Sequence, residues 1–190
     1  MSGYDALVLS GGRATRLGGA DKPSLPIGGT ALLDRVLDAV RGADRRIVVG
    51  PPCEGADVVT REQPPGGGPV AAVAAGLAHV VSPVVAVLAA DLPFLTAATV
   101  EGLLAALEPG ADAVVLIDGD GRDQLLISLW RTRALRARLH ALGDPEGQPV
   151  RALLRGLAVQ RWSAPVTAGE PPPWLDCDTY EDLRRAREWA

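Results

Sequence analysis

The chain has 190 residues and a net charge of −4, and 47% of its residues are hydrophobic. A chain of this length favours one domain, which we place at residues 1–190, with a substantial core. The acidic balance argues against binding to nucleic acid or to an anionic membrane, because both need a basic surface. The two cysteines, Cys53 and Cys177, are too few for a disulfide framework or a zinc site, so we expect a reduced, cytoplasmic protein.

No segment of the sequence has the pattern of a membrane address. The first residues, "MSGYDALVLSGG", lack the basic and long apolar regions of a signal peptide. The longest apolar runs, such as "PVVAVLAA", are far shorter than the roughly 20 residues that cross a bilayer. We therefore expect no membrane partner.

Short apolar runs alternate with amphipathic segments along the chain. In chain order, we expect a strand at 6–10, a helix at 31–43, strands at 45–50 and 56–60, a helix at 69–81, a strand at 83–91, a helix at 96–108 with Thr96 as its N-cap, strands at 111–117 and 124–130, two further segments at 131–143 and 149–157, a strand at 158–164 and a helix at 180–190. Strands that are apolar on both faces and are separated by helices predict a three-layer α/β fold, in which helices cover both faces of a mostly parallel sheet. In such sheets ligands bind beyond the carboxyl ends of the strands.

A glycine-rich, cationic loop, "SGGRATRLGGADKPS", follows the first expected strand. Glycines let the backbone approach an anion and aim N–H groups at phosphate oxygens, and Arg16 and Lys22 can add positive charge. We interpret the loop as a triphosphate site; the alternative is an exposed loop whose arginines only solubilise it. It is not a P-loop, because Gly12 and Gly18 are one residue too far apart and Gly19 stands where that motif needs Lys.

A second glycine run, "PPGGGPVAAVAAG", offers a rival interpretation. Gly66, Gly68 and Ala71 fit the spacing of a dinucleotide-binding fingerprint, and Asp91 lies about 20 residues further on, where that fingerprint needs an acidic residue. In the fingerprint, however, the strand runs directly into the first glycine, whereas "REQPP" intervenes here. The rival also leaves the first glycine loop without a purpose.

Carboxylates at the end of one expected strand and before the last expected helix suggest a metal site. Asp91 ends the expected strand at 83–91, and Mg²⁺ is commonly held by one or two carboxylates together with substrate phosphates. The alternative is that Asp91 caps the turn that follows. Asp176 and Asp178 precede the last expected helix, and we expect one of them to cap that helix while the other supplies a second metal contact.

Four segments together resemble a known family. "LSGGRATRLGGADKPSL" resembles the L-x-G-G-x-x-x-R-M/L-G-x-D-K signature of molybdenum cofactor guanylyltransferases and related nucleotidyltransferases. "GGGPVAAVAAGL" resembles that family's G-P-L-A-G segment, "AADLPFL" its C-D-x-P-F/Y segment, and "DCDTYEDL" its closing N-x-N-T-P-E-D-L. The four matches occur in the family's order over essentially the whole chain, and two aspartates replace the closing asparagines.

The resemblance implies a fold like that of the nucleotide-diphospho-sugar transferases and a Mg²⁺-dependent transfer of GMP from GTP to molybdopterin, with release of pyrophosphate. It implies that Arg16, Lys22 and Asp91 are catalytic, with Arg16 and Lys22 binding phosphates and Asp91 binding magnesium. Asp178, from its place before the last expected helix, is the expected second metal ligand. The residues that it places on the nucleotide are Leu9, Ser10, Gly11, Gly12, Arg16, Lys22, Glu62 and Asp91. The pair Gly11-Gly12 resembles the form that accompanies guanine, and molybdoenzyme-maturation proteins are candidate partners.

Other functions stay open from the sequence. They are a cytidylyltransferase acting on the same cofactor, a phospholactate guanylyltransferase, a sugar-phosphate nucleotidylyltransferase, and a non-catalytic nucleotide-binding module that delivers a cofactor. Arg122 and Asp123, beside the turn "DGDG", either reach the acceptor or form a charged hairpin tip. We interpret the two histidines as structural and expect the four tryptophans to be core or partly buried: His79, His140, Trp130, Trp162, Trp174 and Trp189.

Overall fold

A seven-stranded sheet forms the centre of the computed structural model, which describes residues 3–11 and 22–189. The strands are β1 (Tyr4–Leu9), β4 (Arg45–Val49), β5 (Val58–Thr60), β6 (Val84–Ala89), β7 (Ala113–Ile117), β8 (Asp123–Arg131) and β9 (Val159–Ser163), in the spatial order β5-β4-β1-β6-β8-β7-β9. Strand β8 is antiparallel to both of its neighbours, and all other adjacent pairs are parallel. The prediction of a mostly parallel sheet is therefore confirmed.

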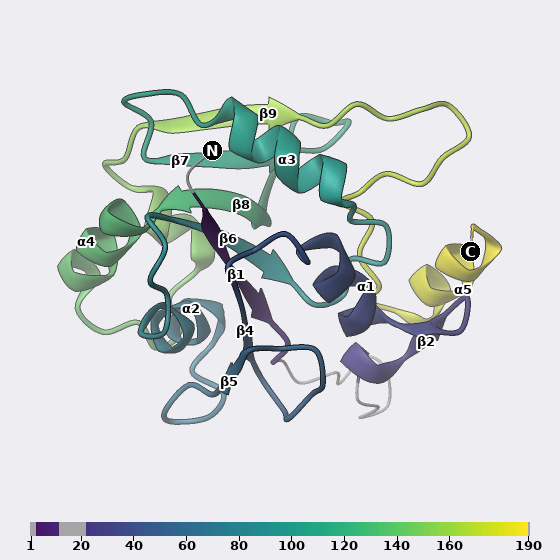
Figure 1. Ribbon diagram of the computed structural model, residues 1–190, viewed down its shortest axis with the longest axis horizontal. Coiled ribbons are helices and arrows are strands. Elements are labelled where there is room, and N and C mark those ends of the chain that lie inside the picture. Colours follow the sequence, from purple (N-terminus) through teal and green to yellow (C-terminus); the bar gives the residue numbers. More distant parts are fainter. Residues whose placement is uncertain (1–2, 12–21, 190) are drawn as a thin grey trace.

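Helices cover both faces of this sheet (Figure 1). They are α1 (Leu32–Ala39), α2 (Pro69–Leu77), α3 (Ala97–Ala106) and α4 (Thr132–Leu142). The last helix, α5 (Tyr180–Glu188), packs beside the sheet on Ile27 and Leu32, and two short 3₁₀ turns are η2 (Lys22–Ser24) and η3 (Val150–Leu154). Ala6 and Val8 of β1 share a core with α1 and α3, whereas Leu7 and Leu9 share the opposite core with α2 and α4. Since both faces of β1 are covered, its sequence reads as a continuous apolar run rather than an alternating one.

Two helices are shorter than the sequence pattern predicts. The apolar periodicity extends over 31–43 and 69–81, but α1 ends at Ala39 and α2 at Leu77. The Arg136 guanidinium of α4 donates a hydrogen bond of 2.7 Å to the carbonyl of Val80, just beyond the end of α2. Carbonyl groups released at the end of a helix need such partners, and a cation is favourable there. The Thr96 N-cap of α3 is as predicted, since its side chain accepts a hydrogen bond from the Thr99 N–H.

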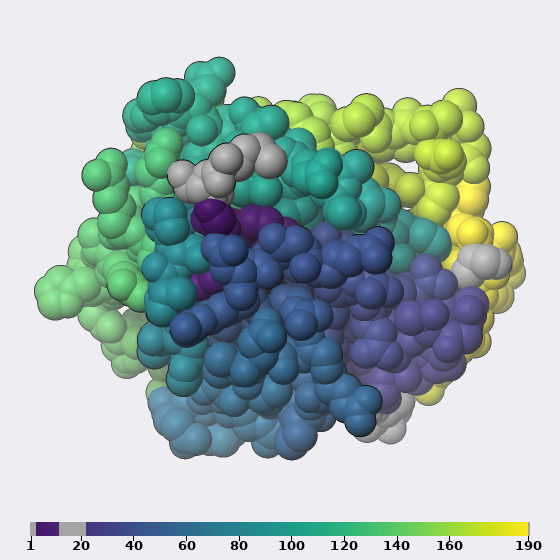
Figure 2. Space-filling model, viewed as in Figure 1, coloured from purple at the N-terminus to yellow at the C-terminus, as the bar shows by residue number. Residues whose placement is uncertain are grey.

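A small hairpin, which the sequence analysis missed, precedes α1. Its strands are β2 (Pro26–Ile27) and β3 (Thr30–Ala31), joined through Gly28 and Gly29 with φ angles of 57° and 85°. Two consecutive positive φ angles are the requirement of a tight hairpin turn, so the dipeptide Gly-Gly was a readable signal. Figure 2 shows the face of the molecule that α1 and the hairpin help to cover, with the loop between β9 and α5 projecting at the upper right. Within the described part of the chain, no helix is both long and apolar enough to cross a membrane.

One carboxylate lies in the core of the sheet. Asp5 of β1 is fully buried, and it accepts hydrogen bonds from the N–H groups of Val81 and Ser82, at 2.6 and 3.0 Å, and from the Ser82 hydroxyl at 2.9 Å. These bonds hold the turn that leads into β6 against the first residues of β1. A buried polar group is tolerated only when it is hydrogen-bonded. Removing the carboxylate leaves the buried Ser82 N–H without its acceptor and also takes the acceptor from the Val81 N–H, whereas the Ser82 hydroxyl can still donate to Asp44 Oδ2 at 3.0 Å.

We expect Asp5→Ala to lower the free energy of unfolding by about 2–5 kcal/mol, because the Val81 and Ser82 N–H groups would lose their acceptor in the core. Urea denaturation followed by circular dichroism measures the change. Asp38→Ala, an exposed aspartate of α1, is the matched control and should change stability by less than about 0.5 kcal/mol. Equal stabilities of the two variants would contradict this role of Asp5.

Candidate active site

The ends of β1 and β6 place two predicted site segments side by side. The strands are parallel neighbours, with Leu9 opposite Ala89, and the Ala90 N–H donates to the Leu9 carbonyl at 3.1 Å. The chain leaves both strands at the same edge of the sheet, Ser10 from one and Asp91 from the other. The segments after β1 and after β6 therefore meet at the carboxyl edge of the sheet, as predicted, because the two strands are parallel neighbours.

Lys22 connects three distant segments at this edge. Its ammonium donates to the Asp91 carboxylate at the end of β6, and to Asp178 Oδ1 at 2.6 Å in the segment before α5. The side chains of Lys22 and Asp91 are only 15% and 21% exposed, whereas that of Asp178 is 51% exposed. The structure therefore brings together three of the predicted site residues, and Asp178 is the one of the three that is most exposed to solvent.

An apolar cluster holds Lys22 and Asp178 close to each other. Ile27 of the hairpin and Leu32 of α1 pack with Cys177 and with Leu183 and Ala186 of α5. The hairpin follows Lys22 directly, and Cys177 precedes Asp178, so this contact fixes both sides of the ion pair. Burial raises the pKa of the Cys177 thiol to about 12, with a smaller contribution from the negative charge of Asp91. The thiol is therefore neutral and acts as a small apolar core residue.

The site holds more negative than positive charge among its described residues. Burial alone would lower the pKa of Lys22, but the charge of Asp91 and the hydrogen bonds that Lys22 donates to Asp178 and Asp91 raise it overall, so Lys22 stays protonated. The pKa of Asp176 is raised, first by withdrawal of its carboxyl from solvent and then by the like charges of Asp178 and Asp91. One ammonium thus faces three carboxylates, and a further cation would be stabilised here.

The residues present fit a divalent cation that is shared with a ligand. Asp91 and Asp178 both contact one Lys22 nitrogen, so oxygens of two carboxylates already converge around a positive charge. No group of three or more His, Cys, Asp or Glu in residues 3–11 and 22–189 is arranged to hold a metal by itself. Mg²⁺ needs no such protein cage, since it commonly takes one or two carboxylates and completes its shell with phosphates and water.

The predicted cap of the last helix is wrong. Thr179 is the N-cap of α5: its side chain accepts from the Asp182 N–H at 3.1 Å, and Asp182 accepts from the Thr179 N–H at 2.8 Å. Asp178 is instead directed to Lys22, and Asp176 lines a cavity beside it. The spacing Thr-x-x-acid was the signal that identifies the capping residue, because it lets the two side chains cap each other's N–H groups.

The predicted nucleotide-binding residues lie partly within the described chain. Ser10 is buried, and its hydroxyl has no hydrogen-bond partner among the described residues. Gly50 lies against it so closely that a Cβ at this position would be 2.9 Å from the Ser10 Cβ. Gly12 and Arg16 lie outside the described residues, so their roles stay predictions.

Glu62, also predicted on the nucleotide, follows β5, two strands away from β1. Its carboxylate accepts a hydrogen bond of 3.0 Å from the Gly66 N–H, within the second glycine run. The structure therefore places Glu62 at the same edge of the sheet as Lys22, but no contact between them is present among the described residues. Its role at the nucleotide stays a prediction.

A cavity of about 390 Å³ opens beside the Lys22 cluster, and sequence reasoning missed most of its lining. It is bounded by the loop after β6, the beginning of β8, one residue of η3 and the segment before α5: Ala89, Asp91, Leu92, Asp123, Gln124, Leu125, Leu126, Ile127, Val150, Trp174, Asp176 and Asp178. Of the two alternatives for the hairpin residues, Asp123 lines this cavity. Arg122 is exposed at the tip and pairs with Asp120 at 2.7 Å.

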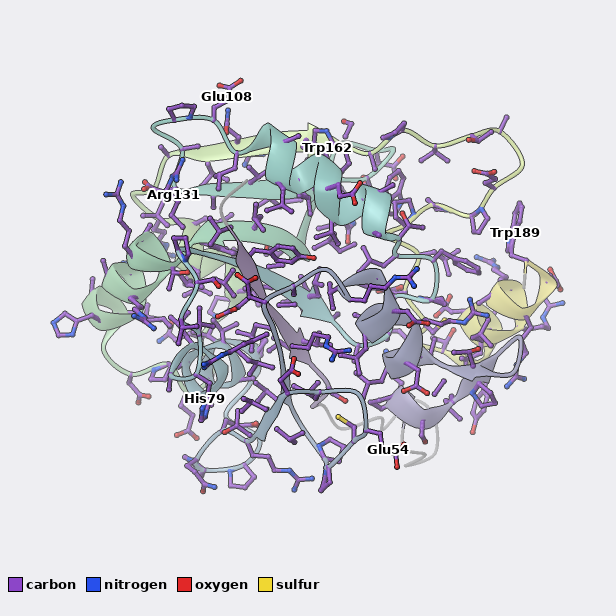
Figure 3. The ribbon with its side chains drawn as sticks, in the orientation of Figure 1. Glu54, His79, Glu108, Arg131, Trp162 and Trp189 are labelled. Carbon is purple, nitrogen blue, oxygen red and sulfur yellow. The ribbon has the colours of Figure 1, made fainter. Side chains whose placement is uncertain are left out.

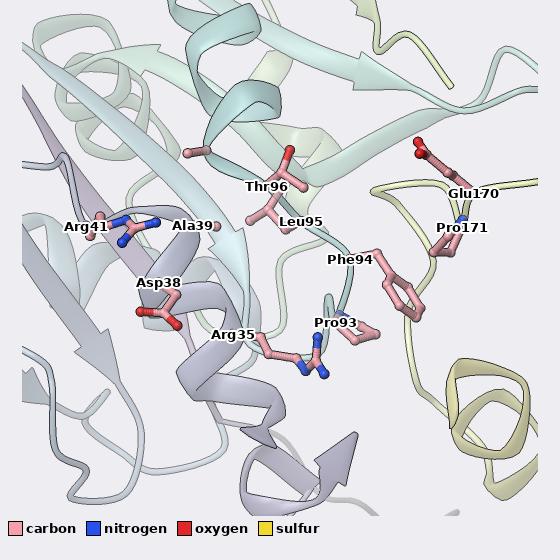
Figure 4. A pocket seen from close by; sticks show the side chains of 11 residues that line it. Arg35, Asp38, Ala39, Arg41, Pro93, Phe94, Leu95, Thr96, Glu170 and Pro171 are labelled. Atoms are coloured by element: carbon pink, nitrogen blue, oxygen red, sulfur yellow. The ribbon is translucent and has the colours of Figure 1, made fainter. Parts of the chain in front are cut away.

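A second cavity, of about 430 Å³, lies outside this cluster. Figure 4 shows its lining, which comes from α1, from the residues that lead into α3, and from the loop between β9 and α5. Its charged residues are Arg35, Asp38, Arg41 and Glu170, and it is not lined by any residue of the Lys22 cluster. The Arg35 guanidinium already donates to the Ile27 carbonyl at 2.6 Å, so it serves to hold the hairpin.

The two histidines are not part of the cluster, and of the four tryptophans Trp174 lines the cavity beside it. His79, labelled in Figure 3, and His140 are both exposed on or beside helices, in agreement with a structural interpretation. Trp130 is buried, Trp162 packs against Gly102 of α3, and Trp174 is partly buried. The expectation of a core or partly buried side chain is wrong for Trp189, which is 48% exposed at the end of α5, because the helix turns it outward from the apolar cluster.

Comparisons with known proteins agree with this geometry. A molybdenum cofactor guanylyltransferase of Bradyrhizobium sp. (strain ORS 278) is 32% identical to this chain over 196 residues, which cover 97% of this chain and 92% of that protein. A molybdenum cofactor guanylyltransferase of Burkholderia lata is 37% identical over 158 residues, covering 73% of this chain and 76% of that protein.

A solved structure shows the same fold. The crystal structure of molybdopterin-guanine dinucleotide biosynthesis protein A from Archaeoglobus fulgidus has a TM-score of 0.76 at 22% identity, and the match covers 97% of each chain. The predicted fold of the nucleotide-diphospho-sugar transferase type is thereby confirmed. A family model for the MobA-like NTP transferase domain matches residues 6–164, which contain both Lys22 and Asp91. The chain belongs to the MobA-like NTP transferase family.

Proposed function

We propose that this protein is a guanylyltransferase, which transfers GMP from GTP to the phosphate of molybdopterin, or of the molybdenum cofactor, and releases pyrophosphate. The observation that carries the proposal is the Lys22 ammonium held between Asp91 and Asp178, at the edge where β1 and its glycine-rich loop end. The names of the relatives, both molybdenum cofactor guanylyltransferases, support the choice of donor and acceptor.

The reaction needs positioning and charge neutralisation more than proton transfer. The terminal phosphate of the acceptor attacks the α-phosphorus of GTP in line, the bond to the β-phosphate oxygen breaks, and pyrophosphate leaves with that bond's electrons. Because the attacking phosphate is already an anion, the step requires little general base. The protein must instead stabilise negative charge that develops on the α-phosphate and on the leaving group.

Lys22 is placed to provide that stabilisation. An ammonium has three N–H donors, and two of them serve the Asp91 and Asp178 carboxylates. The third can donate to a phosphate oxygen without loss of the other two, so the carboxylates fix the direction in which the cation is presented. Asp91 and Asp178 would hold Mg²⁺ together with nucleotide phosphates, and bound Mg²⁺ would neutralise phosphate charge and make the α-phosphorus more electrophilic. Arg16 would bind the same phosphates.

The alternatives differ in base, acceptor or chemistry. The pair Gly11-Gly12 favours guanine over the cytosine of the cytidylyl relatives, through the resemblance of this segment to the guanylyl form. A module that only binds and delivers a cofactor would not need Lys22 and Asp91 converging where the phosphates lie.

The cellular setting follows from the same proposal. Cys53 and Cys177 are both free, which fits a reducing compartment, and we place the reaction in the cytoplasm. A nucleotide-bearing cofactor made there must be passed to the enzymes that use it. Molybdoenzyme-maturation proteins are therefore the partners that the proposed product requires.

Lys22→Ala and Asp91→Ala should each reduce turnover by about 100- to 1,000-fold or more, because each removes a charge aimed at the reacting phosphates. Pyrophosphate release from GTP with molybdopterin measures the effect, and circular dichroism checks that the variants are folded. Arg133→Ala, which removes an exposed cation of α4, is the matched control and should retain normal turnover. Near-normal turnover by either site variant would refute the role assigned to that residue.

Removal of divalent cations with EDTA should abolish turnover, and added Mg²⁺ should restore it, because Asp91 and Asp178 are assigned to hold the ion. Asp178→Asn should raise the Mg²⁺ concentration that gives half-maximal turnover, whereas Asp120→Asn, on the exposed hairpin tip, should not. The Mg²⁺ titration of pyrophosphate release makes the comparison. Full activity in EDTA would remove magnesium from the mechanism.

Asp176 leads to a prediction about the ligand-free protein. Its pKa is raised in the folded state, so the folded chain binds this proton more tightly than the unfolded chain does. Stability that is present below the ordinary pKa of aspartate is therefore lost as the pH rises through the folded-state pKa. Asp176→Asn removes that loss, so the variant should melt at a higher temperature than the native protein at pH 7.

The difference between Asp176→Asn and the native protein should shrink as the pH falls toward 4, since both then carry a neutral side chain. Thermal melting without Mg²⁺ or nucleotide, at several pH values, follows this difference. A variant that is less stable than the native protein at neutral pH would show that the Asp176 charge is favourable in the folded state.

A further inference from the structure

The 390 Å³ cavity is continuous with the proposed reaction centre. Asp91 and Asp178 line one part of it, and the Lys22 ammonium contacts both of these carboxylates. From there the cavity extends to the beginning of β8 and to Trp174. A phosphate that reacts next to Lys22 would thus have the rest of its molecule in this cavity, and the lining indicates what that rest can be.

An irregularity in β8 shapes one wall of the cavity. Val115 of β7 pairs with Ser128, but the next residue, Leu116, pairs with Gln124, so three residues of β8 have no partner on β7. The Ser128 hydroxyl donates to the Leu125 carbonyl at 2.8 Å and stabilises this bulge. The residues of the bulge line the cavity: Leu125, Leu126 and Ile127. Bulges of this kind commonly redirect side chains next to functional sites.

The polar side chains of the lining are almost all hydrogen-bond acceptors. Four are carboxylates, and the lining residues that belong to the described part of the chain include no Lys, Arg or His. The Gln124 amide uses its NH₂ group to donate to Asp118 at 2.9 Å, which leaves its carbonyl oxygen for the cavity. Among the described lining side chains, the remaining donors are the second N–H of this amide and the Trp174 indole. The lining therefore favours a ligand that carries N–H or O–H donors and disfavours one that carries a carboxylate.

Arg161 fixes the orientation of one of these carboxylates. Arg161 lies on β9 and Asp123 at the start of β8, with β7 between the two strands. The Arg161 Nε donates to Asp123 Oδ1 at 2.7 Å, and its Nη2 donates to Asp123 Oδ2 at 3.0 Å. This two-point contact holds the plane of the carboxylate. Each carboxylate oxygen keeps a second lone pair, so Asp123 can still accept hydrogen bonds from a ligand.

Trp174 provides a flat apolar surface near Asp123. Its indole is partly buried against the core, and a Cβ at Gly119, in the turn between β7 and β8, would lie 3.8 Å from its Cζ2 atom. The turn therefore supports one edge of the indole while the ring forms part of the cavity wall. A planar heterocycle gains binding energy by stacking on such a side chain.

On the basis of the proposed function, we propose that this cavity holds the ring system of the acceptor. In this assignment, Trp174 stacks on a flat ring, and Asp123, oriented by Arg161, accepts hydrogen bonds from its amino and ring N–H groups. The chemical class is a planar, donor-rich, non-anionic heterocycle, which a pterin fulfils. An acceptor with a carboxylate, such as phospholactate, would face like charges, and a sugar has no planar aromatic ring to stack on the indole.

The test measures binding of the ring without its phosphate, so that it does not depend on turnover. The probes are 6-hydroxymethylpterin, which is uncharged, and pterin-6-carboxylate, both followed by fluorescence anisotropy with the full chain in the presence of Mg²⁺ and a non-hydrolysable GTP analogue. The native protein should bind the uncharged pterin about tenfold or more tightly than the carboxylate. Trp174→Ala should weaken binding of the uncharged pterin about 10- to 100-fold.

Asp123→Asn should weaken binding of the uncharged pterin about tenfold and reduce the discrimination against the carboxylate, because one negative charge is removed. Trp189→Ala and Asp120→Asn are the matched controls, since both residues lie outside the cavity lining, and they should bind both probes like the native protein. Thermal melting confirms that all four variants are folded, and their affinities for the GTP analogue should be unchanged.

Unchanged pterin affinity in both Trp174→Ala and Asp123→Asn would overturn this assignment, as would failure of the native protein to bind the uncharged pterin at millimolar concentration. Either result is compatible with guanylyl transfer, which pyrophosphate release reports in the same preparations. Conversely, selective pterin binding without transfer to any acceptor would support the assignment and refute the proposed function.

Discussion

The contact of one ammonium group with two carboxylates organises the site. Lys22, Asp91 and Asp178 come from the first loop, the end of β6 and the segment before the last helix, and they meet only because the chain folds as it does. Two constraints produce the meeting. Parallel β1 and β6 end at the same edge, and a small apolar cluster of the hairpin, α1 and α5 fixes Lys22 beside Asp178.

The antiparallel strand β8 adds a ligand cavity to the edge of the sheet that carries the Lys22 cluster. Because β8 runs opposite to β6, its first residues lie where β6 ends, and Ile127 pairs with Leu88 near that end. The strand therefore delivers Asp123, Gln124 and the bulge to the same edge as the Lys22 cluster. A wholly parallel sheet would place the beginning of this strand at the opposite edge. The reversal of one strand thus adds a cavity with acceptor groups to a site that otherwise holds phosphates.

Much of the fold could be predicted from the sequence, because doubly covered parallel strands leave a clear apolar signal. The strands and main helices, the N-cap at Thr96, and the convergence of Lys22 with Asp91 all followed from local patterns and from the known geometry of parallel sheets. The end of α2 did not follow, because the contact of Arg136 with the Val80 carbonyl and the bond of the Ser82 N–H to Asp5 engage the residues beyond it, which periodicity does not reveal.

The cavity lining was the part that local patterns could not reveal. Gln124 and the leucines of β8 have the pattern of strand residues, and it is the bulge and the tertiary position of β8 that bring them to the site. Trp174 comes from the segment before α5, and its place in the cavity depends on how that segment folds back. The wrong cap at Asp176 or Asp178 has a similar origin, because Asp178 serves a lysine that is 156 residues away in sequence.

The central claim is that the polyphosphate of the nucleotide binds between Lys22 and the magnesium-bearing carboxylate of Asp91. A crystal structure with a non-hydrolysable GTP analogue and Mg²⁺ tests it most directly. The account predicts Lys22 Nζ in hydrogen-bonding distance of a phosphate oxygen and the metal ion on Asp91. A polyphosphate bound instead at Gly66–Gly68, with Lys22 still bonded only to its two carboxylates, would contradict it.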